Sequence, residues 1–256
     1  MTPAADPLAD LAGLEGVGAA MTAARDAVDA VLRDRGRRQV TAEQRSEAVL
    51  QAARASATLP EPDDADHESG SPPVDHERPT EAATVRLYLG FSELDGLIRI
   101  SPGQVIARAH ALLWRGLLAD DDLGRIRDDP QVADRMTQLG RLLTSPTSAP
   151  VIVVAAIAHA ELITVRPFAA GNGIIARAIE HLIMIDGDLD RPGVTLPELA
   201  HLQAGARYHA ALDDYRTGTA RGVRDWLLYA ADVVTRGAEL SVLRPLRQPG
   251  GSGSRD

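Results

Sequence analysis

The segment from Ala158 to Arg177 carries the residue types best suited to chemistry. An apolar stretch ends near Ile163, and a Gly-Asn-Gly turn at 171–173 leads into a second apolar stretch. Glycines at a helix start let backbone N–H groups face a ligand, and the helix dipole adds partial positive charge. A helix start of this kind binds anions, phosphate in particular. Arg177, one turn into that helix, is placed to add its guanidinium to the same anion.

The Gly-Asn-Gly turn has a second interpretation, a glycine turn between two buried helices, and taken alone it favours that interpretation. The histidines give weaker evidence for a catalytic or metal site. His159 lies on an apolar stretch and is expected to be a hydrogen-bonded core residue, and His110 a surface or structural one. The other three histidines considered lack a partner four residues away with carboxylates on the same face, so no metal site is predicted: His181, His201 and His209.

The wider segment resembles the Fic/Doc (Fido) family, whose motif reads His-Pro-Phe-x-(Asp/Glu)-Gly-Asn-Gly-Arg-x-x-Arg. Further landmarks appear in the family's order. Gly124 to Arg127 precede the motif, and the pattern of Tyr208, Ala211 and Leu212 follows it, with Trp226 beyond. The resemblance covers about residues 85–240. It implies an all-α, Fido-type helical bundle, and a family activity that transfers AMP from ATP to a protein hydroxyl.

By this resemblance, part of the motif is kept. The loop keeps two anchors, with the phenylalanine expected to plug into the core. It also keeps the glycine nest around the nucleotide phosphates and the second motif arginine, which holds the distal phosphates of ATP in the family. The anchors are Pro167 and Phe168, and the phosphate-binding residues are Gly171, Asn172, Gly173 and Arg177.

Three positions of the motif are changed. Arg166 occupies the position of the catalytic histidine, and a guanidinium that stays protonated cannot serve as a general base. The acidic residue that holds Mg²⁺ falls at Ala169 or Ala170, so Mg²⁺ is not expected to be held by the motif. Ile174 replaces the first motif arginine. Arg166 is interpreted either as an extra phosphate-binding cation or as a solvated loop residue.

These changes predict a nucleotide- or phosphate-binding pseudoenzyme with little or no AMP transfer and no assigned catalytic residue. ATP or another nucleotide is the expected ligand. Two alternatives stay open: an active, noncanonical protein adenylyltransferase, and a helical interaction protein with a vestigial pocket. Either would engage a protein target or partner.

The N-terminal region and the family's flap also depart from the family. Residues 53–61 resemble the end of the family's inhibitory helix, whose motif begins with a serine or threonine, here Ser56. The glutamate that this motif places four residues later is Pro60 in this chain, which favours a lost inhibitor. Glu61 is the remaining acidic candidate. Few residues separate Arg127 from the next predicted helix, so a short or absent β-hairpin flap is expected.

Apolar spacing places helices around this segment. We expect them at 17–34, 42–58, 102–118, 131–143, 150–163, 174–186, 196–216 and 222–243, with helical pattern resuming from residue 80. Capping boxes are predicted at Thr41 with Gln44 and at Thr195 with Glu198. The predicted domains are N-terminal helices (1–59), an acidic, proline-rich linker (60–79), a Fic-like domain (80–246) and a disordered tail (247–256).

The composition of the chain excludes several classes of protein and of site. The 256 residues are 45% hydrophobic and contain no cysteine, which excludes a disulfide framework and thiolate metal sites. A net charge of −9 argues against nucleic-acid and membrane-surface partners. We find no secretory signal, so a cytoplasmic location is expected. The abundance of alanine, arginine and aspartate is typical of a GC-rich bacterial genome, such as an actinobacterial one. The oligomeric state is left open.

Overall fold

The computed structural model describes residues 6–34, 40–60 and 79–243. The predicted tail, the predicted linker apart from its end residues 60 and 79, and Glu61 lie outside these ranges. Within them the chain is helical, and the only strand-type pairing is an isolated β-bridge between Arg115 and Leu118. The predicted all-α fold is therefore confirmed. None of the described helices combines the length and apolarity needed to cross a bilayer.

The elements follow one another along the chain with short connections. They are α1 (Pro7–Ala12), α2 (Val17–Asp34), α3 (Ala42–Thr58), α4 (Glu81–Leu89), α5 (Phe91–Leu94), α6 (Pro102–Trp114), the 3₁₀ turn η1 (Asp120–Asp122), α7 (Pro130–Thr144), α8 (Val151–Val165), α9 (Asn172–Asp186), α10 (Pro197–Ala204), α11 (Ala206–Arg216) and α12 (Ala220–Glu239).

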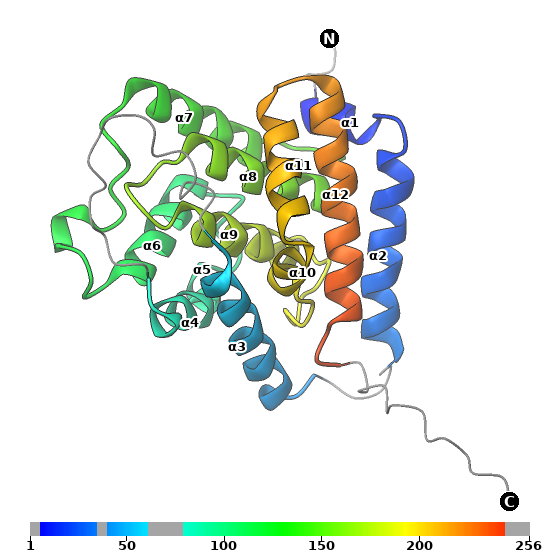
Figure 1. The fold of residues 1–256 in the computed structure, drawn as a ribbon, viewed down its shortest axis with the longest axis horizontal. Coiled ribbons are helices and arrows are strands. Elements are labelled where there is room, and N and C mark those ends of the chain that lie inside the picture. Colours follow the sequence, from blue (N-terminus) through cyan, green and yellow to red (C-terminus); the bar gives the residue numbers. More distant parts are fainter. Residues whose placement is uncertain (1–5, 35–39, 61–78, 244–256) are drawn as a thin grey trace, which may run out of the picture.

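Helices α8 and α9 form the centre of the molecule (Figure 1). Helix α8 is apolar around its whole circumference, and every residue of α9 from Asn172 to Met184 is buried. A helix that is hydrophobic all round must be covered on all sides. The covering elements include α7 beside α8, α6 and α3 beside α9, and α12, which packs on α8. Trp226 on α12 fixes that last contact by donating its Nε1–H to the Ala156 carbonyl, 2.9 Å away.

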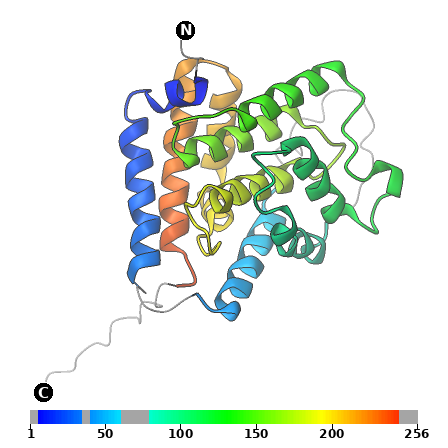
Figure 2. The same cartoon turned by 180° about the vertical axis from the view of Figure 1, so that it is seen from behind.

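The N-terminal helices pack on this core by separate routes. Helix α2 lies along α12, as both views show (Figure 1, Figure 2). Helix α3 packs against α4 and α10, and its C-terminal end reaches α9. The capping box predicted at Thr41 and Gln44 is confirmed, since each residue's side chain bonds the other's backbone N–H, at 3.0 and 3.2 Å. The C-terminal end of α3 thus lies against the N-terminal half of α9.

The helix predicted at 222–243 ends early, at Glu239, and two further predicted helix boundaries were wrong because of glycines. The helix expected at 196–216 is broken into α10 and α11 by Gly205, whose φ of 55° with ψ of −123° is open to glycine and strained for other residues. The helix expected to reach residue 118 ends at Trp114, and Gly116 follows at φ 78°. Both misses come from glycines inside an otherwise helical pattern.

The turn between α9 and α10 is organised by a buried carboxylate. Asp190 Oδ2 accepts hydrogen bonds from the backbone N–H of Val194 (2.8 Å) and from the N–H and hydroxyl of Thr195 (both 2.6 Å). The capping box predicted at Thr195 and Glu198 is therefore wrong, because the Thr195 hydroxyl is bonded to Asp190. Leu196 is the residue before α10, and it makes no side-chain cap.

We expect Asp190→Ala to lower the free energy of unfolding by about 3 kcal/mol, because two buried amides and a hydroxyl lose their acceptor together. Urea denaturation measures the change. The matched control is Asp232→Ala, which removes an exposed ion pair with Arg207 and should change stability by less than about 1 kcal/mol. Equal effects of the two substitutions would show that the carboxylate does not organise the turn.

Candidate functional site

The loop between α8 and α9 is closed by its own asparagine. Asn172 is buried, its Oδ1 accepts from the Phe168 N–H and its Nδ2–H donates to the Phe168 carbonyl, both at 2.9 Å. This pair of bonds shapes the residues between them into a compact loop. Phe168 is 1% exposed and Pro167 is buried, as expected of loop anchors. The side chain of Asn172 is therefore used in bonds within the loop. Only its backbone belongs to the first turn of α9.

Gly171 sets the point at which α9 begins. It precedes the helix with φ 76°, and a Cβ built there would stand 2.9 Å from Trp114 Nε1 and 3.0 Å from Leu113 Cδ2. Both the backbone angle and the space therefore require glycine. The helix starts at Asn172, so the first turn of α9 begins directly after this glycine. This is the predicted phosphate nest, which is buried from Gly171 through Ile174.

Arg127 ties the preceding segment to this loop. Its backbone N–H donates to the Pro167 carbonyl at 2.8 Å, and its guanidinium donates to the carbonyls of Arg166 (2.7 Å) and Val165 (3.1 Å). Arg166 ends α8 in the left-handed conformation, at φ 52°, and is half-buried. The stretch between α6 and α7 holds η1 but no strand pair, so the expectation of a short or absent hairpin flap is confirmed for it.

His110 supports the loop from α6. Its ring stacks on Phe168 with 4.0 Å between centroids, and its Nδ1 accepts the Gly124 N–H at 3.0 Å. The side chain is 2% exposed, so the surface option considered from the sequence is wrong and the structural one holds. Burial lowers the pKa of His110 to about 4. The ring is therefore neutral near pH 7, as an acceptor at Nδ1 must be.

Arg177 points into the protein rather than toward solvent. It is fully buried, its Nε–H donates to Ser56 Oγ at 3.0 Å, and one terminal N–H donates to the Ser56 carbonyl at 2.9 Å. A second terminal N–H approaches the Tyr208 hydroxyl at 3.5 Å. Helix α3 thus contributes two acceptors to the guanidinium predicted to hold phosphate. The residues resembling an inhibitory-helix end do reach the motif, through Ser56.

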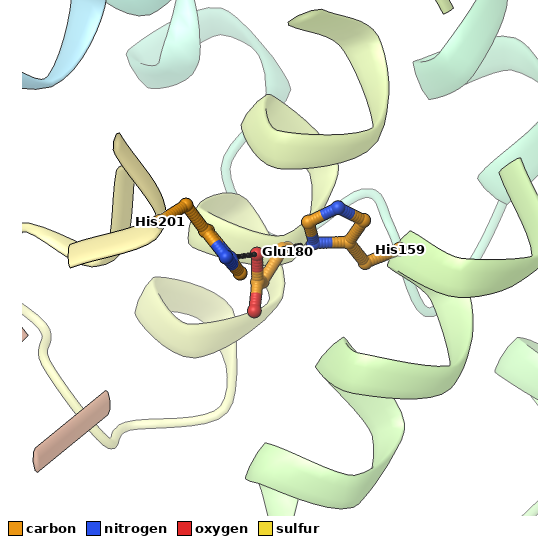
Figure 3. A group of neighbouring side chains, drawn as sticks. All are labelled: His159, Glu180 and His201. Carbon is orange, nitrogen blue, oxygen red and sulfur yellow. Dashed lines mark hydrogen bonds and ion pairs between the residues drawn. The ribbon is translucent and has the colours of Figure 1, made fainter. Parts of the chain in front are cut away.

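Beyond Arg177 the interior holds a cluster that the sequence did not reveal. Glu180 Oε2 lies 2.5 Å from His159 Nδ1 and 3.1 Å from His201 Nε2, and all three side chains are at most 2% exposed (Figure 3). The outer ring nitrogens meet tyrosine hydroxyls, with His159 Nε2 at 2.8 Å from Tyr208 and His201 Nδ1 at 2.9 Å from Tyr229. The His159 expectation, a hydrogen-bonded core histidine, is borne out by these contacts.

One arrangement of protons satisfies the whole cluster. Burial lowers the pKa of His159 and outweighs the opposite effect of the neighbouring Glu180 carboxylate, so this ring is neutral. Burial alone would raise the pKa of Glu180, but the facing rings of His159 and His201 lower it below its usual value. An ionised carboxylate then accepts from both inner N–H groups, and each outer nitrogen accepts from a tyrosine O–H.

The same three side chains form a geometric candidate for a metal centre, because their ligand atoms lie within 4.8 Å of one another. Two histidines and a carboxylate are a common zinc ligand set. Here, however, each inner nitrogen is within direct hydrogen-bonding distance of Glu180. The hydroxyls of Tyr208 and Tyr229 are hydrogen-bonded to the outer ring nitrogens and complete the network without a metal ion. We therefore interpret the cluster as a buried proton-ordered network that gives Arg177 a nearby countercharge.

Comparison with known proteins agrees with this architecture. Residues 100–184 match the model of the Fic/DOC family, a range that contains the loop, Arg127 and most of α9. This segment is therefore similar to the Fic/DOC family. No curated protein sequence matches the chain.

Solved Fic structures share the fold over most of the chain. A Fic family protein from Desulfovibrio desulfuricans G20 is 20% identical, with a TM-score of 0.64 over 86% of this chain and 74% of that chain. Fic-1 from C. elegans is 19% identical, with a TM-score of 0.61 over 88% of this chain and 72% of that chain. At these identities the likeness establishes the fold and nothing finer.

The structure gathers the predicted motif residues in one place but in different environments. Arg166 lies at the loop start, Ala169 is exposed and Arg177 is enclosed beneath α3. Sequence reasoning missed Glu180 and His201, because their partners come from helices far apart in the chain. An available signal was Glu180 itself, an ionisable residue inside an apolar helix, which must find a partner when buried.

The pKa of His110 predicts acid sensitivity of the Fic fold. As the pH falls below about 6.5, the unfolded chain takes up a proton that the folded chain, with a pKa of about 4, refuses. The free energy of unfolding therefore decreases as the pH is lowered across this window, by up to about 3 kcal/mol at pH 4. We expect His110→Gln, which keeps an acceptor for Gly124, to remove this part of the pH dependence.

Urea denaturation of both proteins between pH 4 and 7 measures the difference. His209→Gln is the control, because that ring takes no part in the Phe168 stack. Parallel curves for the wild-type chain and His110→Gln would contradict the buried, neutral assignment.

Proposed function

We propose that this chain is a cytoplasmic, nucleotide-binding Fic-domain pseudoenzyme with little or no AMP-transfer activity. One observation carries the proposal: the loop that feeds α9 presents an arginine and two alanines where a proton acceptor and a metal ligand would be needed. A group that stays protonated cannot take a proton from a hydroxyl near neutral pH. The loop nevertheless keeps the glycine-flanked helix start that favours anions.

Phosphate is the part of a nucleotide that these residues suit. The first-turn backbone of α9 and the guanidinium of Arg166 would hold it, with Arg177 as the second cation. Magnesium fits less well, since no residue from Arg166 through Arg177 carries a carboxylate and hard cations need oxygen ligands. We therefore expect binding to depend on the phosphates and not on a motif-bound metal.

Helix α3 opposes this binding in the arrangement described. The Arg177 guanidinium already has two acceptors on Ser56, so a phosphate must displace α3 to engage it. The measured affinity is then the intrinsic affinity multiplied by the fraction of molecules in which α3 has moved. A weak but Arg177-dependent interaction is the expected result for the unmodified chain.

Titration calorimetry with ATP, with and without Mg²⁺, tests the proposal. We expect Ser56→Ala to tighten binding about five- to tenfold, because Arg177 loses one of its two α3 acceptors. Arg177→Met, which keeps a long apolar stem, should abolish binding. Arg135→Gln is the matched control, since this arginine pairs with Glu161 away from the loop. Circular dichroism checks that each variant folds.

Activity is tested separately with ATP labelled at the α-phosphate, incubated with the chain alone and with a cell lysate. We expect no transfer of label. Transfer at an appreciable rate would overturn the pseudoenzyme assignment and support the noncanonical adenylyltransferase. Absence of ATP binding in the unmodified chain and in Ser56→Ala would instead support an interaction protein with a vestigial pocket.

A further inference from the structure

A second hollow lies away from the Fic loop, under the N-terminal half of α3. It is a cavity of about 310 Å³ between α3, the α4–α5 corner, the C-terminal half of α9 and the turn at 191–193. This volume lies within the range of small-molecule sites. Along α3, the lining residues Arg45 and Val49 lie about 16 and 10 Å from Ser56, and Tyr88 of the lining interacts with both Ser56 and Arg177.

The inner end of the cavity carries a buried imidazole with one unused nitrogen. His181 is 3% exposed, and its Nδ1 is hydrogen-bonded to Glu198 Oε1 at 2.8 Å. No described residue bonds Nε2, which lies 3.8 Å from where a Cβ on Gly193 would stand, and Gly193 lines the cavity. Nε2 can therefore bond an occupant of the cavity.

The protonation of His181 decides which partner suits it. Burial opposes the charged form, but the carboxylates of Glu198, Asp190 and Glu180 together outweigh it and raise the pKa of His181. With Nδ1–H given to Glu198, the protonated form of the ring, which the raised pKa favours, carries its second proton on Nε2. The cavity therefore offers a hydrogen-bond donor at its inner end, and an occupant must present an acceptor there.

The walls and the mouth differ in character. Tyr88 and Phe91 lie with ring centroids 4.8 Å apart, and each meets the His181 ring edge-on, which gives the cavity an aromatic, apolar wall. At the mouth, Arg191 holds both oxygens of Asp95 at 3.1 Å, whereas the exposed Arg45 pairs with no described carboxylate. The mouth therefore has an uncompensated positive charge.

We infer that this cavity binds a small organic monoanion: its apolar body lies against Tyr88 and Phe91, a neutral acceptor at its inner end meets His181 Nε2, and its carboxylate lies at the mouth near Arg45. The anion belongs at the mouth because the inner end already contains the Glu198 carboxylate and has two further acidic residues, Asp190 and Glu180, nearby. A ligand bridging α3 and α9 here would also hold α3 on the core.

The inference is tested with 4-acetylbenzoate, which places a carbonyl and a carboxylate at opposite ends of an aromatic ring. We expect saturable shifts of the His181 imidazole signals in ¹H–¹⁵N NMR spectra, with a Kd of about 1 mM or tighter. Two analogues of similar shape, each lacking one of the two polar groups, measure the contribution of each group to binding. 4-Acetylbenzamide, without the charge, and 4-isopropylbenzoate, without the acceptor, should each bind about tenfold more weakly.

Exposed residues supply variants that leave the core intact. Arg45→Gln should weaken 4-acetylbenzoate about fivefold, and Arg54→Gln, on the same helix but outside the cavity, should not. Ser46→Trp should block the mouth, whereas Ser46→Ala should have no effect. The inference is overturned if no saturable shift of His181 occurs up to about 10 mM ligand, if the neutral amide binds equally well, or if Arg45→Gln and Arg54→Gln behave alike.

Discussion

The ionisable side chains inside the central helix pair are the constraint on which the rest of this structure depends. Helices α8 and α9 are covered on all sides, yet they carry His159, Arg177, Glu180 and His181. Each of these groups must find its partner within the protein, because a buried, unpaired charge is unstable. Arg177 takes Ser56 from α3, and Glu180 takes two imidazoles. The packing of the outer helices is thus linked to the charges of the inner ones.

This link connects the loop between α8 and α9 with the N-terminal region through the Arg177–Ser56 contacts. The loop is shaped by its own residues, through the Asn172 bonds and the close approach of Gly171 to Trp114. The second motif cation, however, is oriented by α3. A phosphate arriving at the α9 start meets a guanidinium that is already solvated by protein acceptors. Under the proposed function, phosphate binding at the loop and docking of α3 would compete for the same hydrogen-bond donors.

Local sequence signals predicted much of the fold and part of the site. The Thr41–Gln44 capping box set the start of α3, and the apolar runs around the Gly-Asn-Gly turn set α8 and α9. The failures involved a glycine inside a helical pattern, a competing acceptor close in the chain, and partners on other helices. Glycine at 205 broke a helix that periodicity had joined, and Asp190 took the hydroxyl expected to cap α10. The cluster around Glu180 joins three helices, which no spacing rule within one helix reveals.

The central claim is that Arg177 is a buried cation held by α3 rather than an open phosphate ligand. The Nε–H signal of Arg177 in ¹H–¹⁵N NMR spectra of the ligand-free chain tests it most directly. The account predicts a resolved signal, displaced from that of exposed arginines, protected from exchange with water, and shifted by Ser56→Ala. A signal at the position of exposed arginines, exchanging rapidly and insensitive to that substitution, would contradict it.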